Sequence, residues 1–514
     1  MAMANELDGN GAHGGRGARC AWVALAICLA LTIWAAPAAA AANAKEADLQ
    51  QRVAGLIKDL GDNSFRIRED AQTELIRIGP PAIPQLEQAM SSEDAEIRLR
   101  AGNILPKIRK QAAEQASEAI RKRLLWSFTA RGSLAGEAVV AGKAVLCIDS
   151  GGRLTGIDAG TGKHAWSFAA APGARAAAAG DTIYVAGSDK RLHSLDARTG
   201  EPKAGFTSSP AAGNPAAAGG VVYVLDGEGQ LRAMDGQTGK TNWSAPLGAK
   251  AASAPAPVVA GDSVFAVDGD GALHCLSRDA GKSKWTVKDL GAVKALAHDG
   301  GRVILRAGGR VDAIDAGTGK RAWAVDLPAG SNAGGLRVQR QMLWVNGKRI
   351  VTRAQADESI VISGDSVHLS HQGQLICLDA KTGKQRWAHK PNLAAEAGGA
   401  DEDGGVVRVQ GVAQANVAIN VLIAGRALTS GLGGTGITAP AVLGRVLCFG
   451  GPDGLRAIDA RTGELLWRYK TPCGVVGRPV VANGVIYFCT GGIFRTPGAA
   501  GNANLYALSM KAAK

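Results

Sequence analysis

The sequence predicts an all-β protein, an eight-bladed β-propeller of four-stranded blades, preceded by a small all-α domain. The main observation is a repeated phrase. A strand of small and apolar residues ends in Asp, a tight turn of the type Ala-x-Thr-Gly-Lys follows, and a Trp comes three residues later, as in residues 157–166. Further copies are centred on Asp196, Asp235, Ser277, Asp315, Asp379 and Asp459. A phrase repeated at intervals of about forty residues is typical of a radially repeated β-structure.

Composition and charge fit this fold and narrow the choice of partners. The chain of 514 residues contains 70 Gly, and Gly at this level without a collagen period fits many short strands joined by tight turns. The net charge of +13 could attract nucleic acid, anionic lipid or acidic polysaccharide. The sequence has no dense Lys/Arg run with interleaved aromatic residues, so nucleic-acid binding is not expected. We expect the basic residues to occupy exposed turns.

Residues 1–44 are predicted to be an export signal. Arg16 and Arg19 form a basic flank, residues 21–36 are apolar and uncharged, and Ala42-Asn43-Ala44 is a candidate cleavage site. The alternative is an uncleaved anchor, because residues 20–42 carry no charge and are long enough to span a bilayer. Both alternatives place the rest of the chain outside the cytoplasm. We therefore expect a periplasmic or envelope-associated protein, held at the membrane only if the segment is uncleaved.

Residues 45–123 are predicted to form a helical domain. Apolar residues over 67–78 recur over 97–108 at an offset of 30, with spacings that place each set on one helix face. Three prolines over 80–84 break the first helix and frame a shorter one over 83–90. A last helix over about 109–123 is expected after Pro106. The pattern resembles the HEAT-type repeat. It has only about two copies, so we expect it to dock on the propeller, on a partner or on a second copy.

Residues 124–514 are predicted to form the propeller. The residue two before each Asp/Ser position is small in all eight units: Gly156, Ser194, Ala233, Cys275, Ala313, Cys377, Ala457 and Ala507. We take this to mark a crowded site where neighbouring blades meet. The last unit ends before its own outer strand, and residues 124–128 copy the outer strand over 465–469. We therefore expect the first strand to complete the last blade, which leaves no free sheet edge around the ring.

Six cysteines follow the signal segment, and the five that lie inside predicted strands are predicted to be small packing residues. No Cys-x-x-Cys pair is present and no His lies at metal-ligand spacing from a Cys, so no zinc site is predicted. Export permits disulfides, but the sequence does not pair the thiols. The six are Cys147, Cys275, Cys377, Cys448, Cys473 and Cys489.

The repeated phrase resembles the repeat of the pyrroloquinoline-quinone-type (PQQ-like) propellers over residues 124–514. Seven units carry the Trp, and the second unit has Ala204 in its place. The resemblance implies that the Trp packs between blades and that Asp, Thr and Gly stabilise the turn. These residues are therefore expected to be structural and not a quinone site. The seven tryptophans are Trp126, Trp166, Trp243, Trp285, Trp323, Trp387 and Trp467.

The resemblance implies two functional classes. One consists of quinone-dependent alcohol and sugar dehydrogenases, which hold the quinone and a calcium ion on the ring axis with a catalytic Asp and, in many members, adjacent cysteines. This chain has no Cys-Cys pair, and no motif places a catalytic Asp or calcium ligands. Residues 268–271, Asp-Gly-Asp-Gly, could suggest a calcium loop, but they fit a turn between the second and third strands. The other class is non-enzymatic and includes the periplasmic propeller subunit of the outer-membrane β-barrel assembly machinery.

Three connections are longer than the repeat requires: residues 324–358, 389–438 and 491–504. In an up-and-down blade all three open on the same face. Residues 342–349 are predicted to form an extra hairpin with an Asn-Gly turn. The alternatives are that these segments hide a degenerate ninth blade or only cover the ring end. Long loops with aromatic residues often anchor partners, so the predicted partner-binding residues are Trp344, Arg340, Arg349, Arg353, Arg408 and Arg426.

The sequence favours a non-catalytic, exported interaction scaffold of the cell envelope. It is expected to bind a protein or an acidic polymer through the face with the expanded loops, without a cofactor or metal. One alternative is a quinone-dependent dehydrogenase of unusual layout, with pyrroloquinoline quinone and calcium. Another is a cell-wall or polysaccharide-binding module.

Overall fold

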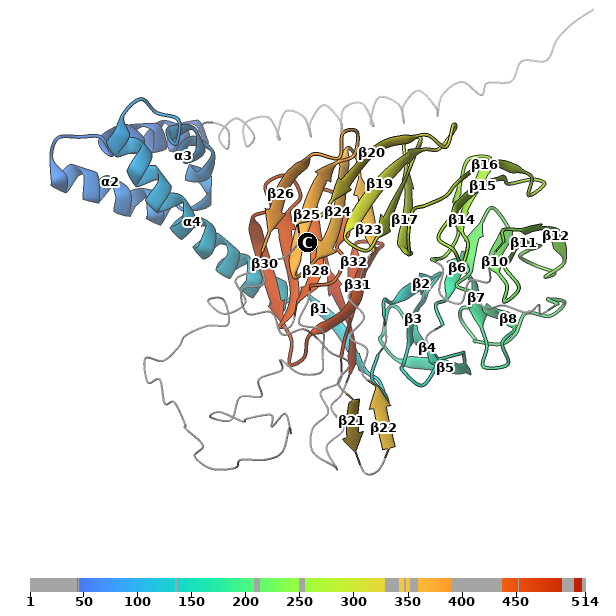
Figure 1. The fold of residues 1–514 in the computed structure, drawn as a ribbon. Coiled ribbons are helices and arrows are strands. Elements are labelled where there is room, and N and C mark those ends of the chain that lie inside the picture. Colours follow the sequence, from blue (N-terminus) through green and yellow to red (C-terminus); the bar gives the residue numbers. More distant parts are fainter. Residues whose placement is uncertain are drawn as a thin grey trace, which may run out of the picture. The chain divides into compact units, whose positions relative to one another are not determined.

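The computed structural model separates into two compact units, residues 1–112 and residues 113–514 (Figure 1). Of the predicted export signal over residues 1–44, residues 1–43 lie outside the described part of the chain. The described residues are 44, 46–134, 136–172, 174–207, 213–248, 255–328, 342–345, 348–351, 359–390, 437–451, 453–491 and 503–510.

The first unit is helical, as predicted. Its described helices are residues 46–59, α2 (Phe65–Ile78), α3 (Ile83–Ala89) and the first part of α4 (Ala95–Arg121), with a 3-10 turn over Pro80–Ala82. Their apolar faces meet in one core that includes Val53, Leu75, Leu86, Ile104 and Ile108. The predicted break before Pro80 and the short helix after it are confirmed.

Two arginines show that the helical segment repeats. The Nη1 of Arg68 donates to the backbone carbonyls of Asp62 and Asn63, at 2.7 and 3.1 Å. Thirty residues later, the Nη1 of Arg98 donates to the carbonyls of Ser92 and Glu93, at 2.6 and 2.8 Å. Each of the two predicted copies starts with Ile-Arg, at residues 67–68 and 97–98. In both copies the Arg thus ties the preceding loop to the first turn of its helix.

The predicted separate helix over residues 109–123 is wrong. The helix α4 runs from Ala95 to Arg121 with Pro106 inside it. Proline removes one backbone donor and crowds the carbonyl one turn earlier. The helix nevertheless continues because Leu105 and Ile108, on either side of Pro106, are buried in the core of the first unit, and this burial offsets the lost hydrogen bond.

The second unit is an eight-bladed propeller, as predicted. Blade one consists of β2 (Val139–Ala141), β3 (Ala144–Ile148), β4 (Arg153–Asp158) and β5 (His164–Ala169), and blade two of β6 (Ala177–Ala179), β7 (Thr182–Ala186) and β8 (Leu192–Asp196). Blade three consists of β9 (Ala216–Ala218), β10 (Val221–Leu225), β11 (Gln230–Asp235) and β12 (Thr241–Pro246), and blade four of β13 (Val258–Ala260), β14 (Ser263–Val267), β15 (Leu273–Ser277) and β16 (Ser283–Val287).

Blades five to eight follow the same order, with one extra hairpin. Blade five consists of β17 (Val293–Asp299), β18 (Arg302–Ala307), β19 (Arg310–Asp315) and β20 (Arg321–Asp326), and blade six of β23 (Ile360–Ser363), β24 (Ser366–His371), β25 (Gln374–Asp379) and β26 (Gln385–His389). Blade seven consists of β27 (Ala441–Leu443), β28 (Val446–Gly451), β29 (Gly454–Asp459) and β30 (Leu465–Lys470), and blade eight of β31 (Val475–Ala482), β32 (Val485–Thr490), β33 (Asn504–Ser509) and β1 (Leu124–Thr129). The hairpin is β21 (Met342–Val345) and β22 (Lys348–Val351).

The ring closes as the sequence predicts. The first strand, β1, pairs antiparallel with the last, β33, and Trp126 lies opposite Ala507. The second blade differs from the others in the described residues, because its sheet has three strands. A bridge between Leu195 and Pro202, continued by the bond from the Lys203 N–H to the carbonyl of Ser194 at 2.8 Å, marks the place of its outer strand. This is the unit in which Ala204 replaces the repeated Trp.

The repeated tryptophans join successive blades, as the resemblance implied. The indole N–H of Trp285, in the fourth blade, donates to the carbonyl of Ala316 in the fifth blade at 3.1 Å. Its ring also lies against Gly319, where an added Cβ would stand 2.8 Å from a ring carbon. Gly319 has a φ of +72°, so both space and backbone conformation require glycine. The equivalent indole bonds are Trp126 to Ala159, Trp166 to Ala197, Trp243 to Arg278, Trp323 to Ala380 and Trp387 to Ala460, at 2.9–3.0 Å.

The small residues two before the Asp/Ser position are crowded from two sides, by their own blade and by the next one. Gly156 lies directly opposite Trp166 of its own blade, and an added Cβ would stand 2.2 Å from the Trp166 ring. Cys275 and Cys377 face Trp285 and Trp387 in the same way. The outer-strand Trp of the same blade therefore fills part of the space. The predicted meeting of neighbouring blades is also confirmed, because Ala233, Cys275 and Ala313 each share a buried cluster with residues of the next blade.

Two interfaces between blades depart from the Trp pattern. Between blades two and three, the buried Tyr184 hydroxyl donates to the carbonyl of Gly236 at 2.9 Å. This is the position that an indole bonds elsewhere.

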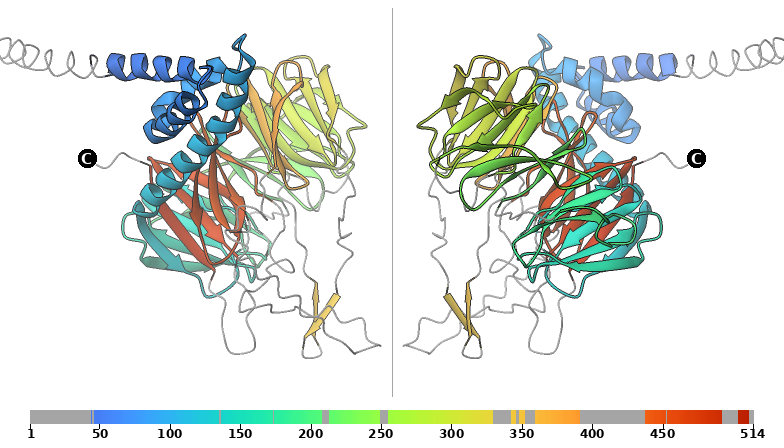
Figure 2. Two further views of the ribbon diagram at one scale, coloured as in Figure 1. Left: turned by 90° about the vertical axis from the view of Figure 1, so that its left-hand side faces the viewer. Right: turned by 90° about the vertical axis from the view of Figure 1, so that its right-hand side faces the viewer.

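Between blades seven and eight, the end of α4 packs against the sheets. Ile120 shares a buried cluster with Trp467 and Tyr469 of blade seven and with Phe488 of blade eight. The backbone N–H of Arg468 donates to the Ser117 hydroxyl at 3.0 Å. Figure 2 shows this end of α4 beside the red strands of the last blades.

Candidate interaction surface

The strand order gives the propeller two different rims. Because the strands of a blade alternate in direction, the turns between strands one and two and between strands three and four lie on one rim, which we call the turn rim. The turns between strands two and three, and the links from one blade to the next, lie on the other rim, which we call the link rim. A rim can bind a partner only through side chains that are not already bonded within the propeller.

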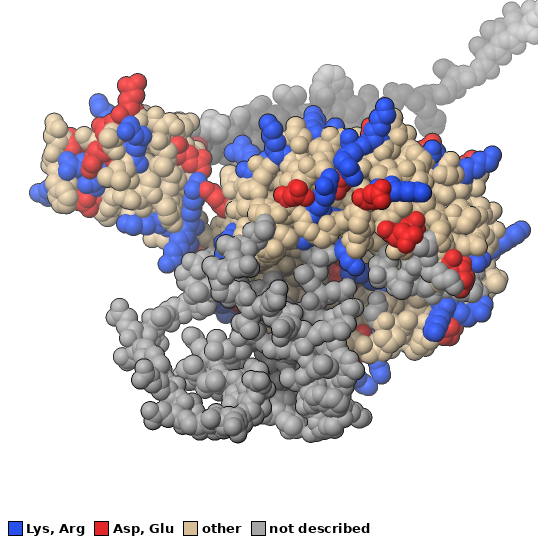
Figure 3. Space-filling view, viewed as in Figure 1, with Lys and Arg blue, Asp and Glu red and all other residues tan. Residues whose placement is uncertain are grey.

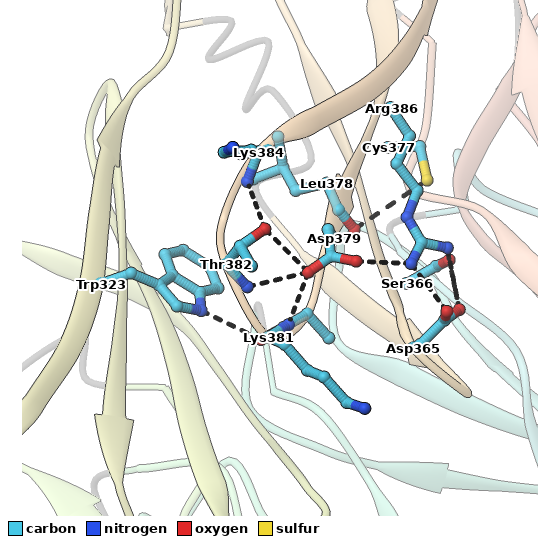
Figure 4. Close-up of polar contacts among 11 residues, drawn as sticks. Trp323, Asp365, Ser366, Cys377, Leu378, Asp379, Lys381, Thr382, Lys384 and Arg386 are labelled. Atoms are coloured by element: carbon cyan, nitrogen blue, oxygen red, sulfur yellow. Dashed lines mark hydrogen bonds and ion pairs between the residues drawn. The ribbon is translucent and has the colours of Figure 1, made fainter.

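Asp379 shows the chemistry of the turn rim (Figure 4). Its Oδ1 accepts hydrogen bonds from the backbone N–H and the hydroxyl of Thr382, at 2.8 and 2.9 Å. In the same turn, the Trp323 indole donates to the carbonyl of Ala380 at 3.0 Å. The carboxylate therefore holds the turn that receives the tryptophan. Matching Asp–Thr hydroxyl bonds occur at Asp158, Asp196, Asp235 and Asp315.

Arg386 adds charge pairing to this turn. Its Nη2 lies 2.5 Å from Asp379 Oδ2 and 2.7 Å from Asp365 Oδ2. Its Nη1 lies 2.9 Å from both Asp365 Oδ1 and the Ser366 hydroxyl. The Arg386 guanidinium, followed by Thr382, holds the pKa of Asp379 well below its usual range. Both carboxylates are thus committed to structure, as the resemblance implied for the turn residues.

The link rim repeats an aspartate of another kind. Asp226 follows β10, and its Oδ1 accepts from the backbone N–H groups of Glu228 and Gln230, both at 2.9 Å. Its Oδ2 accepts from Arg232 Nε at 2.8 Å. Burial raises the pKa of Asp226, but the hydrogen bonds from Gln230 and Arg232 outweigh burial and leave the pKa below its ordinary value. Related pairs are Asp189 with His193 and Asp453 with Arg456. These pairs were not predicted from the sequence; their signal is a basic residue three to six positions after the Asp.

Asp268 has the same role, which bears on the calcium alternative. Its Oδ1 accepts from the backbone N–H groups of Asp270 and Ala272, at 3.0 and 2.9 Å. Its Oδ2 lies 2.8 Å from His274 Nε2. The segment is a turn between the second and third strands of blade four, and both Asp268 oxygens already have partners. Within the described ranges, no group of three or more His, Cys, Asp and Glu is arranged to hold a metal ion. Asp268 is therefore a turn residue whose oxygens are already used within its own blade.

The six cysteines that follow the signal segment are all buried and unpaired, including the five predicted to be packing residues. Burial raises the pKa of Cys147 and of Cys448 to about 12, and that of Cys377 to about 11. These thiols are therefore protonated at neutral pH. They pack between strands, as the sequence predicted for Cys275 and Cys377.

The predicted partner-binding residues fall mainly outside the described part of the chain. The hairpin predicted over residues 342–349 is confirmed: β21 pairs with β22, and Trp344 lies opposite Arg349. The side chains of these two residues are outside the description. Arg340, Arg353, Arg408 and Arg426 lie in segments that are not described.

The strands that flank the long connections confirm where these connections belong. The first joins β20 to β23, and the second joins β26 to β27, so both run from one blade to the next. The third joins β32 to β33, the second and third strands of blade eight. By strand direction, all three open on the link rim. The hairpin β21–β22 belongs to the first of them.

Charge is mixed over the surface that Figure 3 shows. Lys and Arg lie among Asp and Glu in both units, without a continuous basic field on the atoms that are coloured. Of the helices in the described residues, none is long and apolar enough to cross a membrane.

A family model described as "Outer membrane protein assembly factor BamB" matches almost the whole second unit. The matches cover residues 115–205, 169–264, 202–291, 247–422 and 424–513. No curated protein matches the chain.

Solved structures with a similar fold include proteins of different kinds. BamB from Moraxella catarrhalis is 14% identical, with 74% of this chain and 98% of that chain covered and a TM-score of 0.47. The computationally designed protein Ika8 is 14% identical, with 75% and 99% covered and a TM-score of 0.50. Quinohemoprotein alcohol dehydrogenase from Comamonas testosteroni is 16% identical, with 77% and 78% covered and a TM-score of 0.49. At 14% identity, the match to Ika8 bears on the fold and on nothing else.

Proposed function

Because the chain belongs to the family described as outer membrane protein assembly factor BamB, we propose that it is a non-catalytic interaction scaffold of the cell envelope. It would be exported through the segment over residues 1–44 and would bind an envelope protein through the link rim. The observation that carries this proposal is the placement of the three long connections. All three open on one rim, whereas the other rim keeps short turns of one repeated design.

The chemistry of the two rims supports the choice. On the turn rim, carboxylates such as Asp379 and Asp315 hold their own threonines, and the tryptophans are used to join blades. On the link rim, Asp226 and Asp268 are paired within their own turns. The long connections carry the residues that the repeat does not need, including Trp344 on β21. A partner would therefore contact the connections rather than the turns.

Site-specific cross-linking in cells would test the proposal. A photoreactive amino acid would replace Trp344 in the full-length chain, and a matched control would carry it at the exposed turn residue Lys163. We expect cross-links to a defined envelope protein from position 344 and not from position 163. Equal cross-linking from both positions, or none from position 344, would contradict binding through the link rim.

A second measurement addresses the non-catalytic part of the proposal. Purified protein would be titrated calorimetrically with pyrroloquinoline quinone, with and without calcium. We expect no saturable heat. Saturable binding at micromolar or lower concentration would overturn the scaffold proposal in favour of a quinone-dependent enzyme.

A further inference from the structure

A cavity of about 500 Å³ opens on the turn rim between blades three and four. Its walls come from the start of β10, from β12, and from the two turns that flank β14 and β15. The aromatic part of the lining is Tyr223, which is fully buried, and Trp243, which is half-buried. The polar part includes Asn242, Asp262 and Arg278.

The cavity lies where the repeat is broken. The residue after the Asp/Ser position is Ala in most units, including Ala316 and Ala380, but it is Arg278 in blade four. The Arg278 side chain reaches back to blade three, where Nε donates to the Tyr223 hydroxyl at 3.3 Å and Nη2 to the carbonyl of Ala218 at 3.2 Å. The residue before the Trp varies from unit to unit, and in blade three it is Asn242, a small amide where other units carry Ala, Leu, Lys or Arg.

The polar groups of the cavity remain largely available to a ligand. Asn242 and Asp279 are exposed, and no hydrogen bond or ion pair of their side chains occurs among the described residues. The amide of Asn242 can both donate and accept, and the carboxylate of Asp279 accepts. Arg278 has five N–H donors. Its three bonds, to Tyr223, Ala218 and Gly261, are 3.2–3.4 Å long and all go to neutral oxygens.

The charges around the cavity balance. Arg278 is positive and Asp279 is negative, while Asp262 forms an ion pair with Lys284 at 2.9 Å. Neither an anion nor a cation therefore gains a net attraction. The remaining features, an aromatic wall beside hydrogen-bonding groups of both kinds, suit a ligand with a flat apolar face and several hydroxyl groups.

We propose that this cavity binds the ring of an uncharged saccharide. The ring would pack against Trp243, and its hydroxyl groups would bond with Asn242, Asp279 and Arg278. This site is separate from the proposed protein-binding surface, because the turn rim and the link rim are at opposite ends of the strands. The two proposals can therefore fail independently.

Calorimetric titration of the full-length protein with cellotriose, maltotriose and chitotriose would test the site. We expect saturable binding of at least one trisaccharide. We also expect the double variant Asn242→Ala/Asp279→Ala to bind it at least tenfold more weakly. Both positions are exposed, so the urea unfolding midpoint of the double variant should stay at the wild-type value.

Two further variants sharpen the test. Lys381→Ala removes an exposed charge at the position in blade six that corresponds to Asp279, so it should bind the trisaccharide like wild type. Arg278→Ala restores the alanine of the repeat and should weaken binding without loss of the fold.

Pelleting with insoluble peptidoglycan would identify the source of the saccharide. If wild type pellets with peptidoglycan and the double variant does not, the ligand is the cell-wall polymer. If wild type binds a trisaccharide in the titration but does not pellet, the ligand is a soluble saccharide. The proposal is overturned if none of the three trisaccharides binds, or if the double variant binds a trisaccharide as well as Lys381→Ala does. It is also overturned if a titration with butylamine, a small organic cation, shows that a cation binds at the cavity instead.

Discussion

The interface between blades four and five follows the repeat, whereas the interface between blades seven and eight departs from it. At the first, Trp285 lies against Gly319 and donates to the carbonyl of Ala316. At the second, blade eight has no Thr-Gly turn, because β33 ends at Ser509 and its outer strand, β1, comes from the start of the propeller. Helix α4 packs there instead, and Ile120 shares a buried cluster with Trp467.

The difference teaches what an interface between blades requires. A large apolar group must cover the edge of each outer strand, and exposed backbone groups need partners. The Trp–Gly pair meets both needs at six interfaces. Tyr184 supplies the hydrogen bond between blades two and three. At the ring closure, Ile120 supplies the apolar cover and Ser117 accepts from the backbone N–H of Arg468.

The largest effect is expected from removal of the regular contact. Trp285→Ala should lower the free energy of unfolding by about 3–5 kcal/mol, because the variant loses the buried ring surface and opens a cavity between blades four and five. Urea unfolding followed by tryptophan fluorescence measures the change. An unfolding curve that matches wild type would show that the blade contact is not made by the indole.

A smaller but still large effect is expected at the irregular interface. Ile120 is 4% exposed, and Ile120→Ala should cost about 2–4 kcal/mol. The matched control is Glu118→Ala on the same helix, whose side chain is 58% exposed and whose replacement should cost less than about 0.5 kcal/mol. If the two variants were equally stable, α4 would not seal the ring, and the comparison between the two interfaces would fail.

Much of this arrangement could be predicted from the sequence, for reasons that differ from one feature to another. The blade count and the ring closure follow from local copies, since residues 124–128 repeat the outer strand over 465–469. The contact of Ile120 with Trp467 could not be predicted, because it joins residues from opposite ends of the propeller. Pro106 also misled the prediction, because a proline inside a helix is tolerated only when tertiary burial supports the turns around it.

The candidate sites were harder to predict for a related reason. The aspartates of the repeat were recognised as structural, since the phrase itself places Thr three residues after Asp379. The cavity beside Arg278 was missed, because its walls belong to two blades and the unusual residues are separated by whole strands. The proposed contacts of Trp344 remain a prediction.

The smallest change in the free energy of unfolding is expected from a comparison of blades four and six. These two blades follow the repeat but differ in one buried ring beside the Trp. In blade four, Phe265 lies 5.8 Å from Trp285, centroid to centroid. In blade six, His368 lies 5.8 Å from Trp387. His368 is 1% exposed, and neither of its ring nitrogens has a hydrogen-bond partner among the described residues. A buried polar group without a partner is destabilising, so His368→Phe should raise the free energy of unfolding by about 1–3 kcal/mol.

The gain from His368→Phe should depend on pH. Burial lowers the pKa of His368 in the folded state to about 4, from an ordinary value of 6.5. As the pH falls below 6.5, the unfolded chain takes up the proton before the folded chain does, so wild type loses stability down to about pH 4. Urea midpoints at pH 7 and pH 5 should therefore differ more for wild type than for His368→Phe. Phe265→His should show the reverse, with lower stability and a new loss at pH 5. A pH dependence that is the same in all three proteins would mean that His368 is not held neutral by burial, and the difference between the two blades would then have no energetic consequence.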